Sequence, residues 1–423
     1  MAMRNSAPES CEAGVDTSFG TRTWGAFAIV LLVAVIVVIA FPRSAPAGGD
    51  AANRTRASGP VPRTVHPPAR ATVSVRPASA PAHPPRMPMK DVCIQPGGLN
   101  RAEWNTLLNL AQRAGVGVIE LDVSWASYEP DLANPAGEFS QLASFVSDAR
   151  SRGLRLRFQL VGFPQWARAA GDPSAARQPR WAPTSAAELV RWSQWVTRVV
   201  SRFGSEVSYY EIWNEENTAA FWAEGANPTE YANLLEASYV AAKAADPAAV
   251  VMFGGLSRND VGFLQATYDA IDKRFPATAV ADHHFFDILG VHPYAGSDSP
   301  AAENPHWVYR DRFGEMDGNF LGFKKLHALM VQEGEGYKHI YIGEYGLSTT
   351  GWNDFPPVSA ATQAGDLTLA YRLAAQTGYV DGFSWYDFFS TPWNSVGFSL
   401  LKGRYPDFRP TPAYRALARI SDS

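Results

Sequence analysis

The stretch that decides the fold lies between residues 186 and 244 and holds three segments in a row: AAELVRWSQWVTRVVSRF (186–203), VSYYEIW (207–213) and TEYANLLEASYVAAKA (229–244). The first and third segments repeat apolar residues at the spacing of amphipathic helices. The middle segment is short and rich in aromatic and β-branched residues, as strands are. Asp246-Pro247 follows the third segment and is a typical helix stop. A strand between two helices predicts parallel βαβ units.

The same alternation continues on both sides of this stretch and fills residues 91–423. A further helical pattern covers Ser140–Arg152. Eight strand–helix units predict an α/β fold, a (β/α)8 TIM barrel. A doubly wound open sheet is the alternative, but it favours a GxGxxG turn after its first strand, and QPGGLN (95–100) does not match. The predicted strands are Val92–Gln95, Gly117–Val123, Arg155–Val161, Val207–Trp213, Val250–Gly254, Ile288–His292, His339–Gly343 and Gly382–Tyr386.

An uncharged apolar run of 18 residues, WGAFAIVLLVAVIVVIAF, occupies positions 24–41. As a helix it is roughly 27 Å long, close to the roughly 30 Å hydrocarbon core of a bilayer. We therefore predict a transmembrane signal-anchor at 24–41, a short cytoplasmic tail at 1–23, and a catalytic domain outside the cytoplasm. No polar stripe interrupts the run, which argues against a buried helix of a soluble domain. Ala45-Pro46-Ala47 keeps a cleaved signal peptide, and hence a secreted protein, as the alternative.

Residues 42–90 hold eleven prolines, ten alanines and almost no large apolar side chains. This composition predicts a disordered Pro/Ala/Arg-rich linker between the membrane and the barrel. The linker has a net charge of +7, whereas residues 91–423 have −10. An acidic domain argues against a nucleic-acid partner.

The sequence gives no sign of a metal or a cofactor. Its two cysteines are too few for a disulfide framework or a Cys-based zinc site. Asp282-His283-His284 groups possible ligands, but their spacing does not aim them at one ion. We therefore expect neither a metal nor a cofactor.

Polar and aromatic residues collect where the predicted strands end. Asn214 and Glu215 follow the fourth strand, and Glu344 follows the seventh. In a barrel these ends meet at one face, where the chemistry takes place. Glu215 and Glu344 would then face each other, and two opposed carboxylates are what hydrolysis of a glycosidic bond requires. Other residues at or just after strand ends are Trp125, Trp166, His292, Tyr294 and Trp385.

These motifs together resemble those of clan A glycoside hydrolases, families 39 and 5 in particular. Trp-Asn-Glu at 213–215 matches the acid/base motif of the fourth strand, and Glu344 in YIGEYGLS matches the nucleophile of the seventh. His292-Pro293-Tyr294 matches the His-x-Tyr of the sixth strand, and Trp385 matches the aromatic residue of the eighth. SWASYEP (124–130) resembles the segment after the second strand. The motifs occur in the family's order and span nearly the whole predicted barrel.

The resemblance implies a retaining mechanism in which Glu215 is the general acid/base and Glu344 the nucleophile, with carboxyls about 5–5.5 Å apart. Asn214 would hydrogen-bond the sugar 2-hydroxyl. Tyr294 would keep Glu344 ionised, because a hydrogen bond to the charged form lowers its pKa, and His292 would add a second polar contact. Aromatic contacts to the sugar are expected from Trp385, Trp125 and Trp166.

The sequence departs from the family pattern at two positions. Glu216 replaces the proline that usually follows the acid/base residue, and Glu120 replaces an arginine of the second strand. Arg155 or Arg157 could supply the missing cation. Glu211 lies deeper on the fourth strand, where we expect it to pair with a barrel arginine. Glu216 should point to the opposite side if the strand continues that far, and the sequence suggests no role for it.

We therefore predict a retaining O-glycosyl hydrolase that acts as a monomer on a polysaccharide or glycan, with the tether pointing to the cell envelope. The first alternative is a non-catalytic carbohydrate-binding barrel protein at the cell surface, although both glutamates are intact. The second alternative keeps the reaction and inverts the anomeric configuration.

Overall fold

The computed structural model describes residues 85–130, 139–168, 181–223, 225–303, 309–352, 355–389 and 397–421. The predicted tail at 1–23, the signal-anchor at 24–41 and most of the linker at 42–90 lie outside these residues. Within the described residues, no helix is both long enough and apolar enough to cross a membrane.

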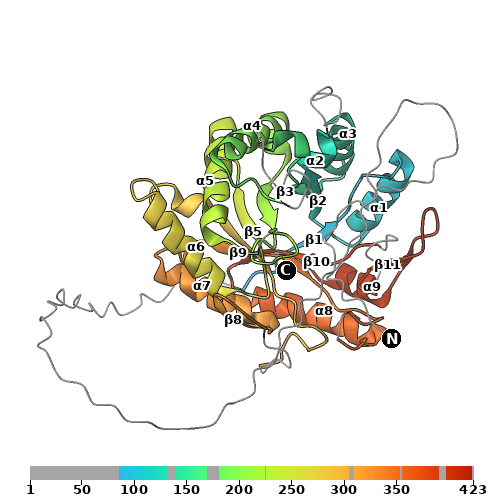
Figure 1. The fold of residues 1–423 in the computed structure, drawn as a ribbon. Coiled ribbons are helices and arrows are strands. Elements are labelled where there is room, and N and C mark those ends of the chain that lie inside the picture. The colour runs from blue at the N-terminus through green and yellow to red at the C-terminus, as the bar shows by residue number, and fades with distance from the viewer. Residues whose placement is uncertain are drawn as a thin grey trace, which may run out of the picture. The chain divides into compact units, whose positions relative to one another are not determined.

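Eight parallel strands close into a barrel in the order β1-β10-β9-β6-β5-β4-β3-β2, and helices surround it (Figure 1). The predicted TIM barrel is therefore confirmed, and each predicted strand has its counterpart. The barrel strands are β1 (Met89–Cys93), β2 (Val118–Ser124), β3 (Arg155–Val161), β4 (Tyr209–Asn214), β5 (Val251–Ser257), β6 (Ile288–His292), β9 (His339–Tyr345) and β10 (Val380–Trp385).

The helices pack their apolar faces on the outside of the barrel. In α4, a capping box between Ser185 and Glu188 fixes the first turn, and Trp192, Trp195 and Val196 are among the residues buried on the inner face. The helices are α1 (Arg101–Arg113), α2 (Trp125–Tyr128), α3 (Phe139–Arg150), α4 (Ala186–Phe203), α5 (Pro228–Ala245), α6 (Val261–Arg274), α7 (Phe323–Gln332), α8 (Ala360–Ala375) and α9 (Pro412–Arg419). Shorter elements are the 3-10 turns η1 (Gln165–Ala167), η3 (Gly204–Glu206), η4 (His283–Phe285) and η5 (Phe320–Gly322), and the pairs β7 (Tyr309–Asp311) with β8 (Gly314–Met316) and β11 (Leu401–Lys402) with β12 (Arg409–Pro410).

Several strand boundaries differ from the prediction, and the start of β1 and the end of β5 differ most. β1 begins at Met89, so the barrel takes in residues that we assigned to the linker at 42–90. The sequence does not indicate this start, because the charged Lys90 is unusual in a buried strand. In the structure Lys90 is buried, and its Nζ donates to backbone carbonyls, including that of Ala114 at 3.0 Å. β5 continues to Ser257 through two glycines that resemble a strand end.

The interior of the barrel changes in character along its axis. Tyr209, Met252, Ile288 and Tyr341 pack together near the N-terminal ends of their strands. Arg157 is buried as well, and its guanidinium lies over the ring of Tyr341, 5.2 Å from the ring centroid. A buried charged group thus packs directly on this apolar layer inside the barrel.

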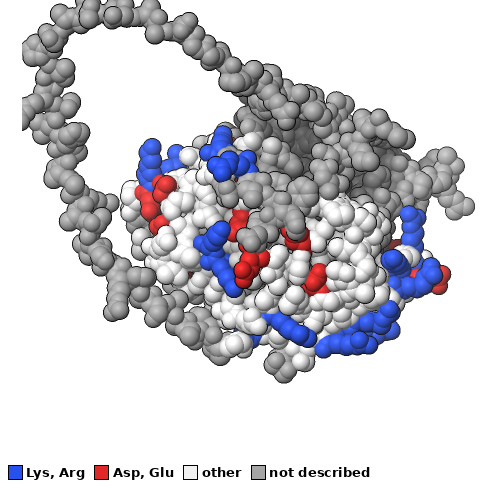
Figure 2. All heavy atoms as spheres, turned by 90° about the horizontal axis from the view of Figure 1, so that it is seen from below, with Lys and Arg blue, Asp and Glu red and all other residues white. Residues whose placement is uncertain are grey.

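The outer surface is mainly uncharged on the face drawn in Figure 2. Acidic side chains lie toward the middle of that face, and most Lys and Arg side chains lie closer to its rim. Among the described residues drawn in this view, uncharged side chains separate groups of basic ones.

Candidate active site

The chain makes an unusual turn at the end of β4, and this turn presents the acid/base candidate. Trp213 and Glu215 adopt left-handed backbone conformations, with φ values of 72° and 42°, which are rare for residues other than glycine. Asn217 fixes the turn, because its side chain accepts from the Ser257 backbone N–H and donates to the Ser257 carbonyl, both at 3.0 Å. Left-handed backbone at non-glycine residues is typical of functional sites, where the surroundings hold it in place.

Two glycines of β5 make room for the side chains of this turn. A Cβ atom at Gly254 would lie 2.2 Å from the Glu216 carboxylate, and one at Gly255 would lie 2.0 Å from Nε2 of His292. Both distances are far shorter than van der Waals contact, so any larger residue would displace these groups.

The two candidate glutamates converge on one histidine. Nδ1 of His292 lies 3.2 Å from Oε1 of Glu215 and 3.9 Å from Oε2 of Glu344. The two carboxylate oxygens can therefore be no farther apart than the sum of these distances, about 7 Å. The structure thus brings Glu215, Glu344 and His292 together at the ends of β4, β9 and β6, as the sequence predicts.

Hydrogen bonds and charges tune these groups. The Tyr294 hydroxyl donates to Oε2 of Glu344 at 2.9 Å. Burial raises the pKa of Glu344, and His292 and Tyr294 both oppose that rise. Burial lowers the pKa of His292, but Glu344 and Glu215 outweigh it and raise the pKa to about 9. His292 is therefore a cation at neutral pH and favours an ionised nucleophile.

Asn214 is positioned to contact a substrate. The last residue of β4, it is buried, and its Oδ1 accepts from Nε2 of Gln159 at 3.1 Å. Its Nδ2 has no hydrogen-bond partner in the described part of the chain. Because an unpaired buried donor is costly, this amide is suited to an acceptor that arrives with a ligand.

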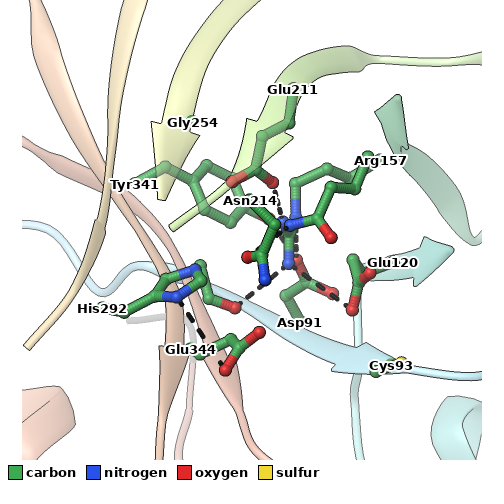
Figure 3. A network of polar contacts seen from close by, with 12 residues as sticks. Asp91, Cys93, Glu120, Arg157, Glu211, Asn214, Gly254, His292, Tyr341 and Glu344 are labelled. Atoms are coloured by element: carbon green, nitrogen blue, oxygen red, sulfur yellow. Dashed lines mark hydrogen bonds and ion pairs between the residues drawn. The ribbon is translucent and has the colours of Figure 1, made fainter. Parts of the chain in front are cut away.

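Arg157 organises the layer below the glutamates (Figure 3). Its Nε donates to Asp91 at 2.9 Å, its Nη1 pairs with Glu211, and its Nη2 donates to the Gly343 carbonyl at 3.1 Å. This confirms that Glu211 pairs with a barrel arginine. Gly343 directly precedes Glu344, so Arg157 holds the backbone beside the nucleophile candidate.

The glutamates that depart from the family pattern are both buried. Glu120 pairs with Arg157 in the β2–β3 register, and its Oε2 lies 3.9 Å from Nη2 of that residue. β4 ends at Asn214, so the alternation of strand side chains does not determine the direction of Glu216. The carboxyl group of Glu216 is buried and has no hydrogen-bond partner among the described residues. Burial raises the pKa of Glu216 well above its usual range.

The three tryptophans lie at the predicted strand ends. Trp125 is buried and stacks on Trp195 at 5.5 Å, whereas Trp166 is half-buried and packs edge-on against Trp125. Trp385 is buried, and its indole N–H donates to the Phe398 carbonyl at 3.2 Å. Their contacts with sugar rings stay a prediction.

Asp282, His283 and His284 lie away from this site, just before β6. Nδ1 of His284 lies 2.9 Å from Glu335, and Nδ1 of His283 lies 2.7 Å from the Tyr337 hydroxyl. Among the residues that the structure describes, no group of three or more His, Cys, Asp or Glu side chains is placed to hold a metal ion.

Sequence reasoning missed Asp91 and Gln159, which support Arg157 and Asn214. Asp91 falls before the predicted start of the first strand, although Met89, Asp91 and Cys93 alternate as strand residues do. Gln159 lies inside a predicted strand as an uncharged polar residue among apolar neighbours. A polar residue at an inward strand position was the signal in both cases.

No protein-family model matches the sequence, and no curated protein does. Solved structures match at the level of the fold. A family 39 glycoside hydrolase from the gut symbiont Bacteroides cellulosilyticus is similar with a TM-score of 0.59 and 21% identity, covering 80% of this chain and 63% of that chain. This chain thus spans less than two thirds of the length of that enzyme.

Two further structures extend the comparison. A monomeric beta-xylosidase from Caulobacter crescentus has a TM-score of 0.55 at 14% identity, covering 80% of this chain and 69% of that chain. An exo-beta-1,4-mannosidase from an Opitutaceae bacterium has a TM-score of 0.54 at 16% identity, covering 78% of this chain and 58% of that chain. The fold of this chain is thus one that glycoside hydrolases share, as the resemblance to clan A implies.

Proposed function

We propose that this chain is a retaining O-glycosyl hydrolase with Glu215 as general acid/base and Glu344 as nucleophile. The observation that supports this best is the convergence of both carboxylates on Nδ1 of His292. The two oxygens lie at most about 7 Å apart, which admits the ~5–5.5 Å of retaining enzymes and only the shortest part of the ~6.5–9.5 Å of inverting ones. The fold, which glycoside hydrolases share, supports the same reaction class.

The first step forms a covalent intermediate. A carboxylate oxygen of Glu344 attacks the anomeric carbon as the glycosidic C–O bond breaks, and the leaving oxygen takes the proton of Glu215. In the second step a water molecule gives a proton to Glu215, its oxygen bonds to the anomeric carbon, and the carboxylate of Glu344 is released. Two inversions at one carbon retain the configuration.

The neighbouring side chains match the demands of these steps. Glu344 must be ionised to attack, and the Tyr294 hydroxyl donates to it at 2.9 Å. The unpaired Nδ2 of Asn214 supplies a donor for the sugar 2-hydroxyl, an interaction that strengthens as positive charge develops on the ring. Arg157 fixes the strand that carries the nucleophile through the Gly343 carbonyl.

We also propose that the substrate is a polysaccharide or glycan of the cell envelope, and that residues 24–41 anchor a monomeric enzyme with its barrel outside the cytoplasm. An apolar segment of membrane length followed by a proline-rich spacer supports this arrangement. Fractionation of expressing cells, followed by protease treatment of intact cells, tests it. A chain found in the soluble cytoplasm would contradict it.

The reaction itself is tested with the purified full-length chain on 4-nitrophenyl glycosides and envelope polysaccharides. Glu344→Gln and Glu215→Gln should each lower kcat at least about a thousandfold. Glu206→Gln, an exposed carboxylate paired with Arg202, is the matched control and should keep full activity. Hydrolysis that survives unchanged in Glu344→Gln would contradict the assignment.

Proton NMR of the first sugar released separates the two mechanisms, because a retaining enzyme preserves the anomeric configuration and an inverting one reverses it. The non-catalytic alternative predicts glycan binding without turnover by the wild-type chain. If no glycan is turned over, calorimetry on the same glycans separates two explanations. A non-catalytic protein binds a glycan of the panel, whereas an enzyme whose substrate is missing from the panel binds none of them.

A further inference from the structure

Glu120 is a buried carboxylate that the proposed reaction does not use. It is 4% exposed and lies on β2 beside Arg157, with 3.9 Å between its Oε2 and Nη2 of the arginine. Among the described residues it has no hydrogen bond. The resembled family has an arginine at this position, so the chain presents an acidic side chain where those enzymes present a basic one.

Arg157 does not meet the needs of Glu120, because its nitrogens already have closer partners. Nε and Nη1 bind Asp91 and Glu211, and Nη2 donates to the Gly343 carbonyl at 3.1 Å. At 3.9 Å, Glu120 is too far from Nη2 for a hydrogen bond. Its oxygens are therefore available to a ligand.

Carboxyl groups outnumber basic groups around the site. Two cations, Arg157 and His292, face six carboxyl groups: Asp91, Glu120, Glu211, Glu215, Glu216 and Glu344. Figure 3 shows the polar side chains of this layer directed toward the interior of the barrel. Both basic groups already face carboxyl groups of the protein, so an anionic sugar would find no unpaired cation among these residues, whereas a cationic sugar would find a carboxyl group that can pair with it.

We propose that the sugar unit bound between Glu215 and Glu344 carries a free amino group, and that Glu120 is the specificity-determining residue that pairs with it. This inference rests on the proposed glycosidase function. The Nδ2 donor of Asn214 requires an acceptor on the sugar, which an ammonium group is not, so the amino group lies at a ring carbon that does not face Asn214.

The protonation of Glu120 is consistent with such a ligand. Burial raises the pKa of Glu120 to about 8, although Arg157 opposes the rise. Near pH 7 the Glu120 side chain is therefore mainly a neutral carboxylic acid. When an amine binds, the proton passes from the Glu120 carboxyl to the amine nitrogen and leaves a carboxylate–ammonium pair, which is the stronger form of hydrogen bond.

The test compares 4-nitrophenyl β-glycopyranosides that differ only in whether C2, C3 or C4 carries an amino, acetamido or hydroxyl group. For one amino position away from C2, the wild-type full-length chain should show a kcat/KM at least about tenfold above that of the hydroxyl analogue. Glu120→Gln keeps the size and removes the charge, so it should abolish that ratio. Glu120→Asp should retain part of it, and Glu206→Gln all of it.

The outcomes separate this inference from the proposed function. Equal or better turnover of the hydroxyl glycosides by the wild-type chain, or a ratio unchanged in Glu120→Gln, would overturn the amino-sugar inference while leaving the glycosidase intact. If no glycoside is turned over, calorimetric titration with the same amino sugars tests the inference. Binding by the wild-type chain that is lost in Glu120→Gln supports it. Absence of binding by the wild-type chain rejects it. A circular-dichroism melt of each variant confirms that it is folded.

Discussion

Two clusters of buried charge occupy successive levels of the barrel, and they differ in how they use their donors. The lower cluster consists of Asp91, Arg157 and Glu211, and each of the three guanidinium nitrogens of Arg157 has an acceptor within the protein. The upper cluster consists of Asn214, Glu215, His292 and Glu344. In this cluster, Nδ2 of Asn214 and Nε2 of His292 have no hydrogen-bond partner among the described residues. Buried polar side chains thus serve structure where partners within the protein hold them, and are available for chemistry where a donor has no such partner.

The sharpest way to break this comparison is to remove the centre of the lower cluster. Arg157→Met leaves Asp91 and Glu211 buried without their cation, and breaking a buried pair in this way costs about 3–5 kcal/mol. Urea unfolding of the full-length chain should show this loss. Activity should fall as well, because the Gly343 carbonyl loses its donor.

The matched control for this prediction is Arg101→Met. Arg101 pairs with Asp148 at 2.8 Å, but its side chain is 66% exposed, so its loss should cost less than about 1 kcal/mol. If the Arg157 variant is no less stable than this control, the lower cluster is not the structural element that the geometry indicates.

Glu216 belongs to neither cluster, and its protonation can be tested through stability. Burial raises its pKa in the folded chain, with Glu211 and Glu215 reinforcing the rise and His292 opposing it. The unfolded chain has an ordinary Glu pKa near 4.3. The folded state therefore binds more protons, and its stability is full below that pH and falls as pH rises toward the raised pKa.

Glu216→Gln removes this dependence. The variant should match the wild-type chain near pH 4 and exceed its unfolding free energy by a margin that grows as the pH rises toward 7, at no more than about 1.4 kcal/mol per pH unit. Urea unfolding across this pH range measures the difference, with Glu206→Gln as the exposed control. A difference that does not change with pH would mean that Glu216 is ionised in the folded state.

The sequence predicts the upper cluster better than the lower one, and the reason is physical. Glu215 and Glu344 can be recognised in the sequence because each follows an apolar strand, and every barrel of this kind brings the C-terminal ends of its strands to one face. The pairing of Arg157 with Asp91 and Glu211 joins residues 66 and 54 positions away along the chain. It depends on register and barrel closure, and no local pattern encodes these.

The turn after β4 shows a second limit of sequence reasoning. Strand alternation predicts the directions of Glu215 and Glu216 only if the strand continues, and it ends at Asn214. The left-handed conformations of Trp213 and Glu215 come from tertiary contacts such as the clasp of Asn217 on Ser257. Neither residue type signals such a backbone by itself.

The smallest predicted effect concerns the upper cluster and tests whether Tyr294 adjusts the pKa of Glu344 or only stabilises the fold. Tyr294→Phe removes the hydrogen bond to Glu344, which favours the ionised carboxylate. The pKa of Glu344 should then rise further, because the hydrogen bond that favours its charged form is lost. Because the nucleophile must be ionised, the acidic limb of the kcat/KM profile should move to higher pH, with a loss of activity below the limb.

Tyr371→Phe is the matched control for this variant. The Tyr371 hydroxyl donates to the Phe383 carbonyl at 2.7 Å on the outer side of the barrel, so the same atom is removed from a purely structural bond. That change should lower the unfolding free energy by about 1 kcal/mol and leave the pH profile in place. If both variants change the unfolding free energy and leave the pH profile unchanged, Tyr294 serves only to pack the site. The Tyr294 hydroxyl would then be a structural group and would not orient the nucleophile.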